Sequence, residues 1–456
     1  MVSEPKTKAT ASDGGGDRPR VAMEELVSLC ARRGFIFQSS EVYGGINGFW
    51  DYGPLGVELK SNLKALWWQR VVRERDDVVG IDSSIIAHPR TWDASGHTEH
   101  FSDPMVDCRA CKKRFRADQL DDAGSCDARV GSSEHDLTEP RNFNLMLQTQ
   151  IGASADASLV AYLRPETCQS IFTDFKRVRE VARQKIPFGI AQIGKAFRNE
   201  ITPRNFTFRS REFEQAEMEF FVHPGQREHW FDYWRQERMR FHRELGFDES
   251  VARNRSHDED ELAHYAKVAV DVDFLFPFGW LEIEGIHDRG DWDLSRHSEY
   301  SGKDLSITDP ETKEKYTPMV IETSMGVDRT CLALLVNAFE EETLEGGETR
   351  RVMHFPPLVA PVKAAVLPLS KKLADPAREL KQELRRYFEC AYDDSGNIGR
   401  RYRRQDEVGT PFCITYDFDS ADDGRVTVRD RDSMEQERVP LDELVAYLRG
   451  ALEGSS

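Results

Sequence analysis

The sequence has no long hydrophobic run, few cysteines and no excess of positive charge. None of its apolar stretches approaches the roughly eighteen residues that a membrane-spanning helix needs, and charged side chains occupy the N-terminal segment where a secretion signal would be apolar. Its eight cysteines are scattered over 456 residues with one close pair, which disfavours a disulfide framework. We therefore predict a cytoplasmic protein that does not associate with a membrane.

Positive charge is in deficit, since 62 Lys and Arg against 80 Asp and Glu give a net charge of −18. An RNA-binding protein with this balance has to use local basic patches. One candidate is the segment 400–404, in which Tyr402 lies among four arginines that could meet phosphates or stack on bases. The alternative is a solvated charged face.

The length is greater than one hydrophobic core usually supports, so two or three domains are expected. We predict a disordered tail over residues 1–20, a first domain over 21–353 and a second domain over 354–456. Two polar inserts, at about 91–140 and 226–265, interrupt the first domain, and the second insert is expected to form a surface helix of mixed charge.

The pattern changes after His354-Phe355-Pro356-Pro357, whose prolines are typical of a linker. Strands are expected at 363–369, 412–418 and 425–429, and helices at 376–387 and from Leu441. Strands that alternate with helices at this spacing favour a small α/β domain with a mixed sheet.

An antiparallel hairpin with charged and aromatic side chains is expected in the middle of the first domain. Because side chains alternate along a strand, Arg209, Phe213 and Glu217 share one face, as do Arg198 and Glu200 on the partner strand. Guanidinium groups, an aromatic plane and carboxylates suit a nucleotide that lies beside an amino acid. The alternative is an ordinary surface strand with exposed ion pairs.

Two further segments add to this constellation. Residues 320–329 predict a strand, a glycine turn and a buried helix, with Glu322 and Ser324 on one strand face and Arg329 at the helix start. A cation is disfavoured at a helix N-terminus, so Arg329 requires an anionic partner, either a bound triphosphate or a nearby carboxylate. Residues 44–56 predict a glycine-rich turn that opens an amphipathic helix, whose apolar stripe is typical of core packing.

In chain order, these pieces resemble motifs 1, 2 and 3 of class II aminoacyl-tRNA synthetases. Motif 2 is matched by Phe197-Arg198-Asn199-Glu200 and Arg209-Ser210-Arg211-Glu212-Phe213, and motif 3 by Gly326-Val327-Asp328-Arg329. Motif 1 is the loosest match, with a helix from Leu59 and a strand over 83–88 that runs into Pro89.

Longer strings resemble one branch of that family, and the similarity extends over about residues 21–447. Five separated strings, in the same order, are similar to glycyl-tRNA synthetases of the homodimeric kind: Ser39-Ser40-Glu41-Val42-Tyr43-Gly44-Gly45, Phe49-Trp50-Asp51-Tyr52-Gly53-Pro54-Leu55-Gly56, Tyr162-Leu163-Arg164-Pro165-Glu166-Thr167, Val408-Gly409-Thr410-Pro411-Phe412 and Arg425-Val426-Thr427-Val428-Arg429-Asp430-Arg431-Asp432.

The resemblance implies an α/β (α+β) fold. The first domain would be a class II catalytic domain on an antiparallel sheet, with the two inserts, and the second an α/β anticodon-binding domain. It also implies a glycine–tRNA ligase that activates glycine with ATP to glycyl-adenylate and transfers it to the 3′ end of tRNA(Gly) in protein synthesis. ATP as substrate, Mg²⁺, tRNA(Gly) and a second copy of the chain are the implied ligands and partners.

Site residues follow from the resemblance position by position. Arg198, Arg209 and Arg329 are implied to be catalytic and to hold the phosphates of ATP, Phe213 to stack on adenine, and Glu282 to hold Mg²⁺. The implied ATP-binding residues are Arg198, Asn199, Glu200, Phe208, Arg209, Ser210, Arg211, Glu212, Phe213, Glu282, Ile283, Gly326, Val327, Asp328 and Arg329.

Glycine recognition is implied to fall to the acidic cluster Glu166, Glu217 and Glu322 with Ser324. Carboxylates attract the ammonium group of glycine, and a filled pocket leaves no room for a larger side chain. The implied glycine-binding residues are Arg116, Glu166, Phe213, Glu214, Gln215, Ala216, Glu217, Glu322, Thr323, Ser324, Met325 and Gly326.

The close cysteine pair begins like a zinc ribbon but is not completed by a second pair. Cys108 and Cys111 are followed only by Cys126, so a fourth sulfur is missing, and structural zinc sites are almost always four-coordinate. His135 or Asp127 could replace it. We do not expect a metal at this degenerate ribbon.

Two other functions are compatible with such a fold. One is aminoacylation of a carrier protein or a small molecule instead of tRNA, which the retained C-terminal domain disfavours. The other is a binding protein without catalytic activity, which the retention of all three arginines disfavours.

Overall fold

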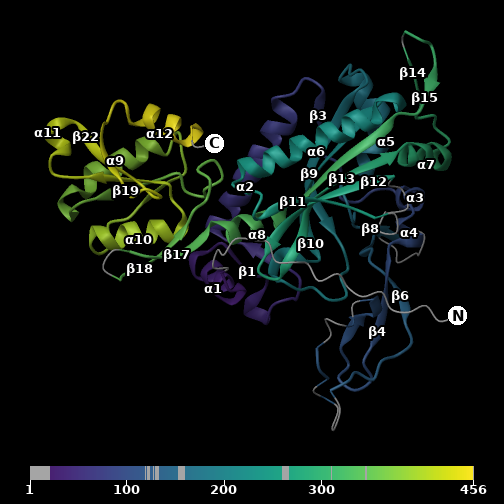
Figure 1. Ribbon diagram of the computed structural model, residues 1–456, viewed down its shortest axis with the longest axis horizontal. Helices are drawn as coiled ribbons and strands as arrows, with labels where there is room; N and C mark the ends of the chain where they lie inside the picture. The colour runs from purple at the N-terminus through teal and green to yellow at the C-terminus, as the bar shows by residue number, and fades with distance from the viewer. Residues whose placement is uncertain are drawn as a thin grey trace.

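The structure is a computed structural model that describes residues 21–118, 120, 124–126, 128, 133–152, 160–258, 267–309, 311–344 and 347–454. The tail predicted for residues 1–20 lies outside the described residues. Figure 1 shows a large central lobe, a C-terminal lobe to its side and a small lobe around β4 and β6 that projects from the centre. Within the described part of the chain, no helix is long and apolar enough to cross a membrane.

A seven-stranded sheet forms the base of the central lobe. Every neighbouring pair is antiparallel except β3 and β9, which are parallel, so the antiparallel sheet predicted from the motifs is confirmed. In spatial order the strands are β11 (Ala252–Ser256), β12 (Val268–Phe276), β13 (Gly279–Gly290), β16 (Met319–Gly326), β10 (Glu212–Val222), β9 (Phe188–Phe197) and β3 (Val78–Gly80).

The predicted hairpin is formed by β9 and β10, with Glu212 opposite Phe197. Arg198, Glu200 and Arg209 were expected on its strands but lie in the connection between them. Side chains of β10 alternate between two environments, as the period of a strand requires. Met218 and Phe220 face the main hydrophobic core, whereas Glu217 faces the other side of the sheet. The strand is therefore buried on both faces, and its charged residues need partners.

Helices cover both faces of this sheet. Three of them pack their apolar stripes into the main core: α2 (Pro54–Trp68), α6 (Arg227–Glu244) and α8 (Val327–Ala338). Two others pack around Phe172 and Leu294 in a second core: α5 (Gln169–Val181) and α7 (Trp292–Ser301). The helix of mixed charge predicted in the second insert is α6, and it is not a plain surface helix. Arg238 and His242 are buried on its inner face, where both contact the carboxylate of Glu284.

Close packing explains one glycine of the predicted turn-and-helix segment, which lies in the first turn of α2. A Cβ atom at Gly56 would lie 1.8 Å from the carbonyl oxygen of Phe35, so only glycine fits there. The strand predicted over residues 83–88 is wrong: within this fully described stretch only Ile86 makes an isolated bridge, to Leu163. Side chains anchor residues 83–88 instead. For example, the hydroxyl of Ser83 donates to Gln192 Oε1 at 2.8 Å.

Short elements complete the central and small lobes. The small lobe has a three-stranded sheet in the order β5, β4, β6. The remaining elements are α1 (Met23–Arg33), β1 (Ile36–Gln38), β2 (Trp50–Tyr52), α3 (Pro89–Ala94), α4 (His97–His100), β4 (Ser102–Asp107), β5 (Arg114–Arg116), β6 (Arg141–Asn144), β7 (Gln148–Gln150), β8 (Val160–Tyr162), β14 (Ile307–Thr308), β15 (Lys315–Tyr316), β17 (Phe339–Thr343) and β18 (Thr349–Met353).

The C-terminal lobe is built on a five-stranded mixed sheet, as the alternation of strands and helices predicted. Strand β19 runs parallel to β20 and β21, and β22 and β23 continue the sheet in antiparallel pairs. Its elements are β19 (Ala364–Pro368), α9 (Ala374–Leu384), β20 (Cys390–Tyr392), α10 (Ile398–Val408), β21 (Phe412–Tyr416), α11 (Ser420–Asp423), β22 (Arg425–Asp430), β23 (Gln436–Pro440) and α12 (Leu444–Glu453).

The basic segment 400–404 lies on α10, and much of it stabilises the lobe itself. Arg401 is buried and donates to the carbonyl oxygens of Asp394 at 2.9 Å and Gly396 at 2.7 Å. Arg404 pairs with Asp393 at 2.7 Å. These two arginines of the segment are therefore engaged within the protein.

The predicted linker is packed rather than extended. Phe355 is fully buried in the main core, and Arg431 of the C-terminal lobe donates to its carbonyl oxygen at 2.9 Å. A buried ion-pair network crosses the same junction: Asp406 of α10 accepts from Arg350 of β18 at 2.9 Å and from Arg429 of β22 at 3.0 Å. The two lobes therefore share a junction of apolar and charged contacts.

Removal of the charge at Asp406 is expected to destabilise this junction strongly. The variant Asp406→Asn keeps the volume but leaves Arg350 and Arg429 without their shared counter-charge, and breaking a buried pair costs about 3–5 kcal/mol. Thermal unfolding followed by circular dichroism should show a clearly lower midpoint. The control Asp423→Asn removes an exposed partner of Arg438 and should cost less than about 1 kcal/mol. Equal midpoints for the two variants would contradict the proposed importance of the network.

Candidate active site

A cavity opens on the face of the sheet that β10, β13 and β16 share. Its lining residues bound about 970 Å³ of space, the open solvent at its mouth included. Strand pairing assembles its lining: Glu217 of β10 lies opposite Ser324 of β16, and Glu322 of β16 lies opposite His287 of β13. Since alternate residues of a strand share a face, these four side chains project to the same side of the sheet.

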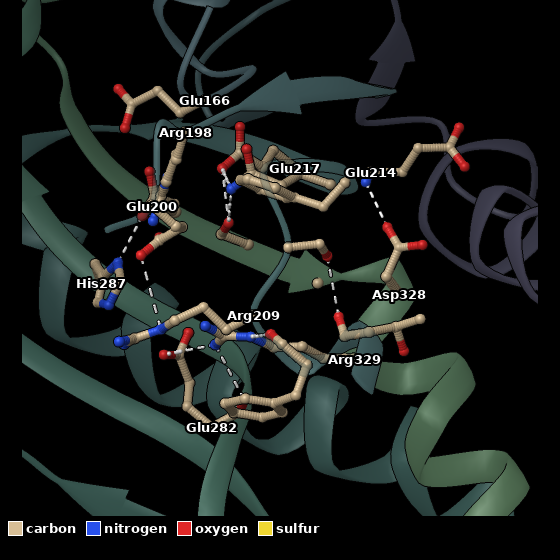
Figure 2. Close-up of a pocket in the computed structure, with 18 residues that line it drawn as sticks. Glu166, Arg198, Glu200, Arg209, Glu214, Glu217, Glu282, His287, Asp328 and Arg329 are labelled. Atoms are coloured by element: carbon tan, nitrogen blue, oxygen red, sulfur yellow. Dashed lines mark hydrogen bonds and ion pairs between the residues drawn. The ribbon is translucent and has the colours of Figure 1, made fainter. Parts of the chain in front are cut away.

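The cavity has a cationic end and an acidic end. Arg209 and Arg329 lie with Glu282 on one side, whereas Glu166 and Glu217 lie on the opposite side (Figure 2). Arginine suits phosphate because its planar fork can donate two parallel hydrogen bonds, and a group of carboxylates suits an ammonium group. The cavity can therefore hold an anion and a cation side by side.

Four neutral donors hold the carboxylate of Glu217. Its Oε1 atom accepts from the Ser324 hydroxyl at 2.6 Å and from Gln215 Nε2 at 3.0 Å. Its Oε2 atom accepts from the Thr167 amide at 2.9 Å and from the Thr167 hydroxyl. These bonds fix the orientation of the carboxylate without neutralising it.

The other two carboxylates of the acidic end have basic partners. His287 Nδ1 lies 2.5 Å from Glu322 Oε1, and Arg289 donates from Nη1 to Glu322 Oε2 at 2.6 Å. Glu166 Oε2 lies 3.3 Å from His97 Nε2. These basic side chains come from β13 and α4: His287 itself lines the cavity, whereas Arg289 and His97 lie outside its lining.

These surroundings separate the pKa values of the three carboxyl groups. Burial raises the pKa of Glu217 to about 7, and the charges of Glu322 and Glu166 act in the same direction. Burial also acts to raise the pKa of Glu322, but Arg289 and His287 together outweigh it and the pKa is lowered. At Glu166, His97, Arg289 and a hydrogen bond from Cys168 together outweigh burial and hold the pKa well below its usual range. Glu217 is thus the carboxyl group whose charge changes near neutral pH.

Aromatic rings position two arginines of the cavity. The Cζ atom of Arg329 lies 4.5 Å from the ring centroid of Phe208, and its Nη1 donates to Glu282 Oε2 at 3.1 Å. The Cζ atom of Arg198 lies 5.3 Å from the ring centroid of Phe213. Such cation–π contacts hold the guanidinium groups in place before any ligand binds.

Ion pairs define the remaining walls. Arg209 Nε lies 3.8 Å from Glu200 Oε2 at the cationic end. Lys60 of α2 reaches Asp328 Oδ1 at 2.8 Å and Glu214 Oε2 at 2.7 Å. Lys60 therefore compensates two acidic residues of the lining and ties α2 to the start of α8.

Comparison with known proteins identifies the family. The tRNA synthetase class II core domain (G, H, P, S and T) matches residues 155–338, and the anticodon binding domain matches residues 363–451. The glycine–tRNA ligase of Lachnospira eligens is 52% identical over 451 aligned residues, which cover 93% of this chain and 98% of the relative. The chain belongs to the glycine–tRNA ligase family. The ligases of Geobacillus kaustophilus and Treponema denticola are also 52% identical, over 94% of this chain and over 98% and 97% of their own lengths.

Membership of the glycine–tRNA ligase family confirms the fold and the enzyme class expected from the motifs. The matched core domain includes β9, β10, β13 and β16, and thus the strands that carry the cavity. The matched anticodon binding domain includes all five strands of the C-terminal sheet.

Most of the residues predicted for the ligase site line this cavity, although their roles stay predictions. The lining includes Glu166, Arg198, Glu200, Phe208, Arg209, Ser210, Phe213, Glu214, Gln215, Glu217, Glu282, Glu322, Ser324, Gly326, Asp328 and Arg329. The predicted residues outside the lining are Arg116, Asn199, Arg211, Glu212, Ala216, Ile283, Thr323, Met325 and Val327.

The residues outside the lining have clear structural reasons for their positions. Ala216, Ile283 and Met325 alternate with lining residues on their strands, so they face the main core on the opposite side of the sheet. Arg116 lies on β5 of the small lobe and donates to Asp103 Oδ2 at 2.6 Å.

Sequence reasoning missed His287, which lines the cavity, and Arg289, which supports Glu322 from behind. Neither belongs to a motif of the ligase family quoted above. A signal was nevertheless present, because buried strands rarely carry charged residues without a reason, and β13 carries Glu282, Glu284 and His287 among apolar residues.

Proposed function

We propose that the protein catalyses the two steps of glycine–tRNA ligation at this cavity. The carboxylate of glycine attacks the α-phosphorus of ATP, pyrophosphate leaves, and glycyl-adenylate remains. A hydroxyl group of the terminal ribose of tRNA(Gly) then attacks the glycyl carbonyl carbon, and AMP leaves. The observation that carries the proposal is the juxtaposition in one cavity of three arginines with three carboxylates, two of them buried and that of Glu166 partly buried.

Positioning and charge stabilisation account for the first step. The attacking carboxylate is already ionised at neutral pH, so the site needs no general base for it. Negative charge accumulates on the phosphates, and we assign its stabilisation to Arg198, Arg209 and Arg329. The rings of Phe208 and Phe213 support this assignment because they hold two of these guanidinium groups in the cavity.

Glycine selection is assigned to the acidic end. Glu166, Glu217 and Glu322 would surround the ammonium group, and Ser324 would help to close the space that a larger side chain needs. A single methylene usually provides only about 1–3 kcal/mol of discrimination, but glycine is the smallest amino acid, so a filled pocket is sufficient.

Divalent metal use is a property of this synthetase class, and we propose Mg²⁺ as the ion. Hard cations prefer carboxylate and phosphate oxygens, and Glu282 offers a carboxylate at the cationic end of the cavity. Glu282 would hold the ion, which would neutralise part of the phosphate charge when bound.

The finer assignments complete the proposal. The domains are taken as 21–353 for catalysis and 354–456 for anticodon binding, with tRNA(Gly) contacting both. Similarity to the homodimeric kind of glycyl-tRNA synthetase supports a homodimer, which sedimentation analysis would test. All eight cysteines are free thiols, which supports a cytoplasmic location.

Glycine-dependent exchange of pyrophosphate into ATP tests the first step, and charging of total tRNA tests the second. We expect exchange with glycine and none above background with alanine or serine. Glycine should be the amino acid attached to tRNA. Exchange that does not depend on glycine would reject the proposed substrate, and exchange without charging would reject tRNA as the acceptor.

A further inference from the structure

Three cysteines and one histidine converge in the small lobe, outside the lining of the proposed active site. Cys108 follows β4 directly, Cys111 lies in the turn between β4 and β5, and Cys126 and His135 come from the connection to β6. One ligand atom from each lies within 4.8 Å of the others. The sequence named His135 as a possible fourth ligand but did not favour a metal, because a histidine there lacks the spacing of a second cysteine pair.

The distances agree with tetrahedral coordination of one ion. A zinc–sulfur bond of about 2.3 Å places two sulfur ligands about 3.8 Å apart at a tetrahedral angle, and a zinc–nitrogen bond of about 2.0–2.1 Å places sulfur and nitrogen about 3.6 Å apart. The Sγ atoms of Cys108 and Cys126 are 3.8 Å apart, and Cys111 Sγ is 3.6 Å from His135 Nδ1. The two independent distances therefore fit the same geometry.

The surroundings favour thiolate ligands over a disulfide or inert buried thiols. A disulfide requires about 2.05 Å between sulfurs, so Cys108 and Cys126 are not bonded to each other. The amide of Cys111 donates to Cys108 Sγ at 3.5 Å, which stabilises negative charge on that sulfur. His135 is oriented as a ligand, because its Nδ1 atom faces Cys111 Sγ. The ring centroids of His135 and Phe115 are 4.5 Å apart, and this packing fixes the plane of the imidazole.

We propose that Cys108, Cys111, Cys126 and His135 form a structural zinc site. Three thiolates and one imidazole in a closed tetrahedral set favour Zn²⁺ over Mg²⁺ or Ca²⁺, which take oxygen ligands. Four protein ligands leave no open position, so the ion has a structural role rather than a catalytic one.

The ion would join the tip of the β4–β5 hairpin to the segment that leads into β6. Leu145, immediately after β6, accepts a hydrogen bond from the amide of Asn199 at 2.8 Å, which connects this lobe to the motif 2 segment. The zinc site would therefore hold the small lobe in a fixed position beside the proposed active site.

Metal analysis of the full-length protein, purified under reducing conditions, tests the site. We expect about one zinc per chain by mass spectrometry. Titration of the metal-free, reduced protein with Co²⁺ should produce thiolate-to-cobalt charge-transfer absorption and the visible bands of tetrahedral cobalt, and Zn²⁺ should remove them. Less than a tenth of a zinc per chain, together with no charge-transfer band, would overturn the proposal.

Variants separate the four ligands from thiols in general. Cys126→Ser and His135→Ala should each lower zinc content at least tenfold after dialysis against a weak chelator. His135→Cys should keep one zinc and strengthen the cobalt charge-transfer band through a fourth thiolate, a result that unfolding of the lobe cannot produce. The control Cys390→Ser, in the C-terminal lobe, should keep the wild-type zinc content and cobalt spectrum. Unchanged zinc content in both Cys126→Ser and His135→Ala would contradict the assignment.

Discussion

Replacement of Arg329 by alanine is expected to slow glycine-dependent pyrophosphate exchange by about 100- to 1,000-fold. Arg329 lies at the cationic end of the cavity, where negative charge would develop as pyrophosphate leaves. Its protein contacts lie at the open cavity: an ion pair to a partly exposed Glu282, worth about 0–1 kcal/mol, a cation–π contact with Phe208, and hydrogen bonds to the carbonyl oxygens of the same two residues. Activity should therefore fall steeply while the thermal unfolding midpoint remains close to that of the unmodified protein.

Two further variants sharpen this test. Arg329→Lys keeps the positive charge but loses the fork geometry, so its exchange rate should lie between those of the alanine variant and the wild type. Arg235→Ala is the matched control, because Arg235 is a similarly exposed arginine of α6 that pairs with Asp232 outside the cavity. An exchange rate within threefold of wild type for Arg329→Ala would remove this residue from the proposed mechanism.

The architecture was predictable where a local period determines the structure. The β9–β10 hairpin, the strand and helix around Gly326, and the mixed C-terminal sheet follow from alternation and turn residues. The strand expected over residues 83–88 does not form, because a short apolar run has no period that separates it from an irregular segment.

The sequence also did not show which charged side chains are buried. Composition suggested that α6 is a surface helix, whereas Arg238 is buried against Glu284, a partner from β13 that lies 46 residues away. The sequence alone predicts that such a charged side chain is exposed to solvent, because it does not show a counter-charge from a distant segment. In the structure that counter-charge allows the side chain to be buried. The same limit applies to Arg401, whose neighbours on α10 suggested an RNA-binding surface.

The spacing of the motifs was sufficient to predict most residues that line the cavity. It did not predict the residues that hold these side chains in place. Arg198 and Arg209 lie in the connection between β9 and β10, Arg329 lies in the first turn of α8, and all three line the cavity. His287 and Arg289 lie outside these motifs, and only the structure shows that both contact the carboxylate of Glu322. Residues that support a ligand-binding side chain are therefore the part of a site that sequence reveals least.

The partners of the three carboxylates at the acidic end differ in charge. Glu322 and Glu166 have basic partners that keep them ionised, whereas the four bonds to Glu217 come from neutral groups. Burial raises the pKa of Glu217 to about 7, so this residue is largely protonated below that pH and ionised above it. An ammonium ligand favours the ionised form and should drive off the proton.

Glycine binding is therefore expected to weaken as the pH falls below about 7. The sign follows from Glu217: below its raised pKa the empty site binds a proton that glycine must displace, so the apparent affinity drops by up to about tenfold per pH unit. His287 contacts the neighbouring Glu322, and its own pKa is raised, against the effect of burial, by that carboxylate. Loss of its proton at higher pH makes the site more negative and acts in the same direction.

The variant Glu217→Gln distinguishes these two groups. It keeps the volume of the side chain but cannot ionise, so the affinity for glycine at pH 8 should fall by about 10- to 100-fold, the worth of a hydrogen bond to a charged group. The dependence on pH between 6 and 7 should also flatten, and any slope that remains belongs to His287. Steady-state exchange across this pH range measures both effects through the Michaelis constant for glycine. If Glu217→Gln retained the full slope of the wild type, the titrating group would be His287, and the ammonium of glycine would have to be held by Glu166 and Glu322.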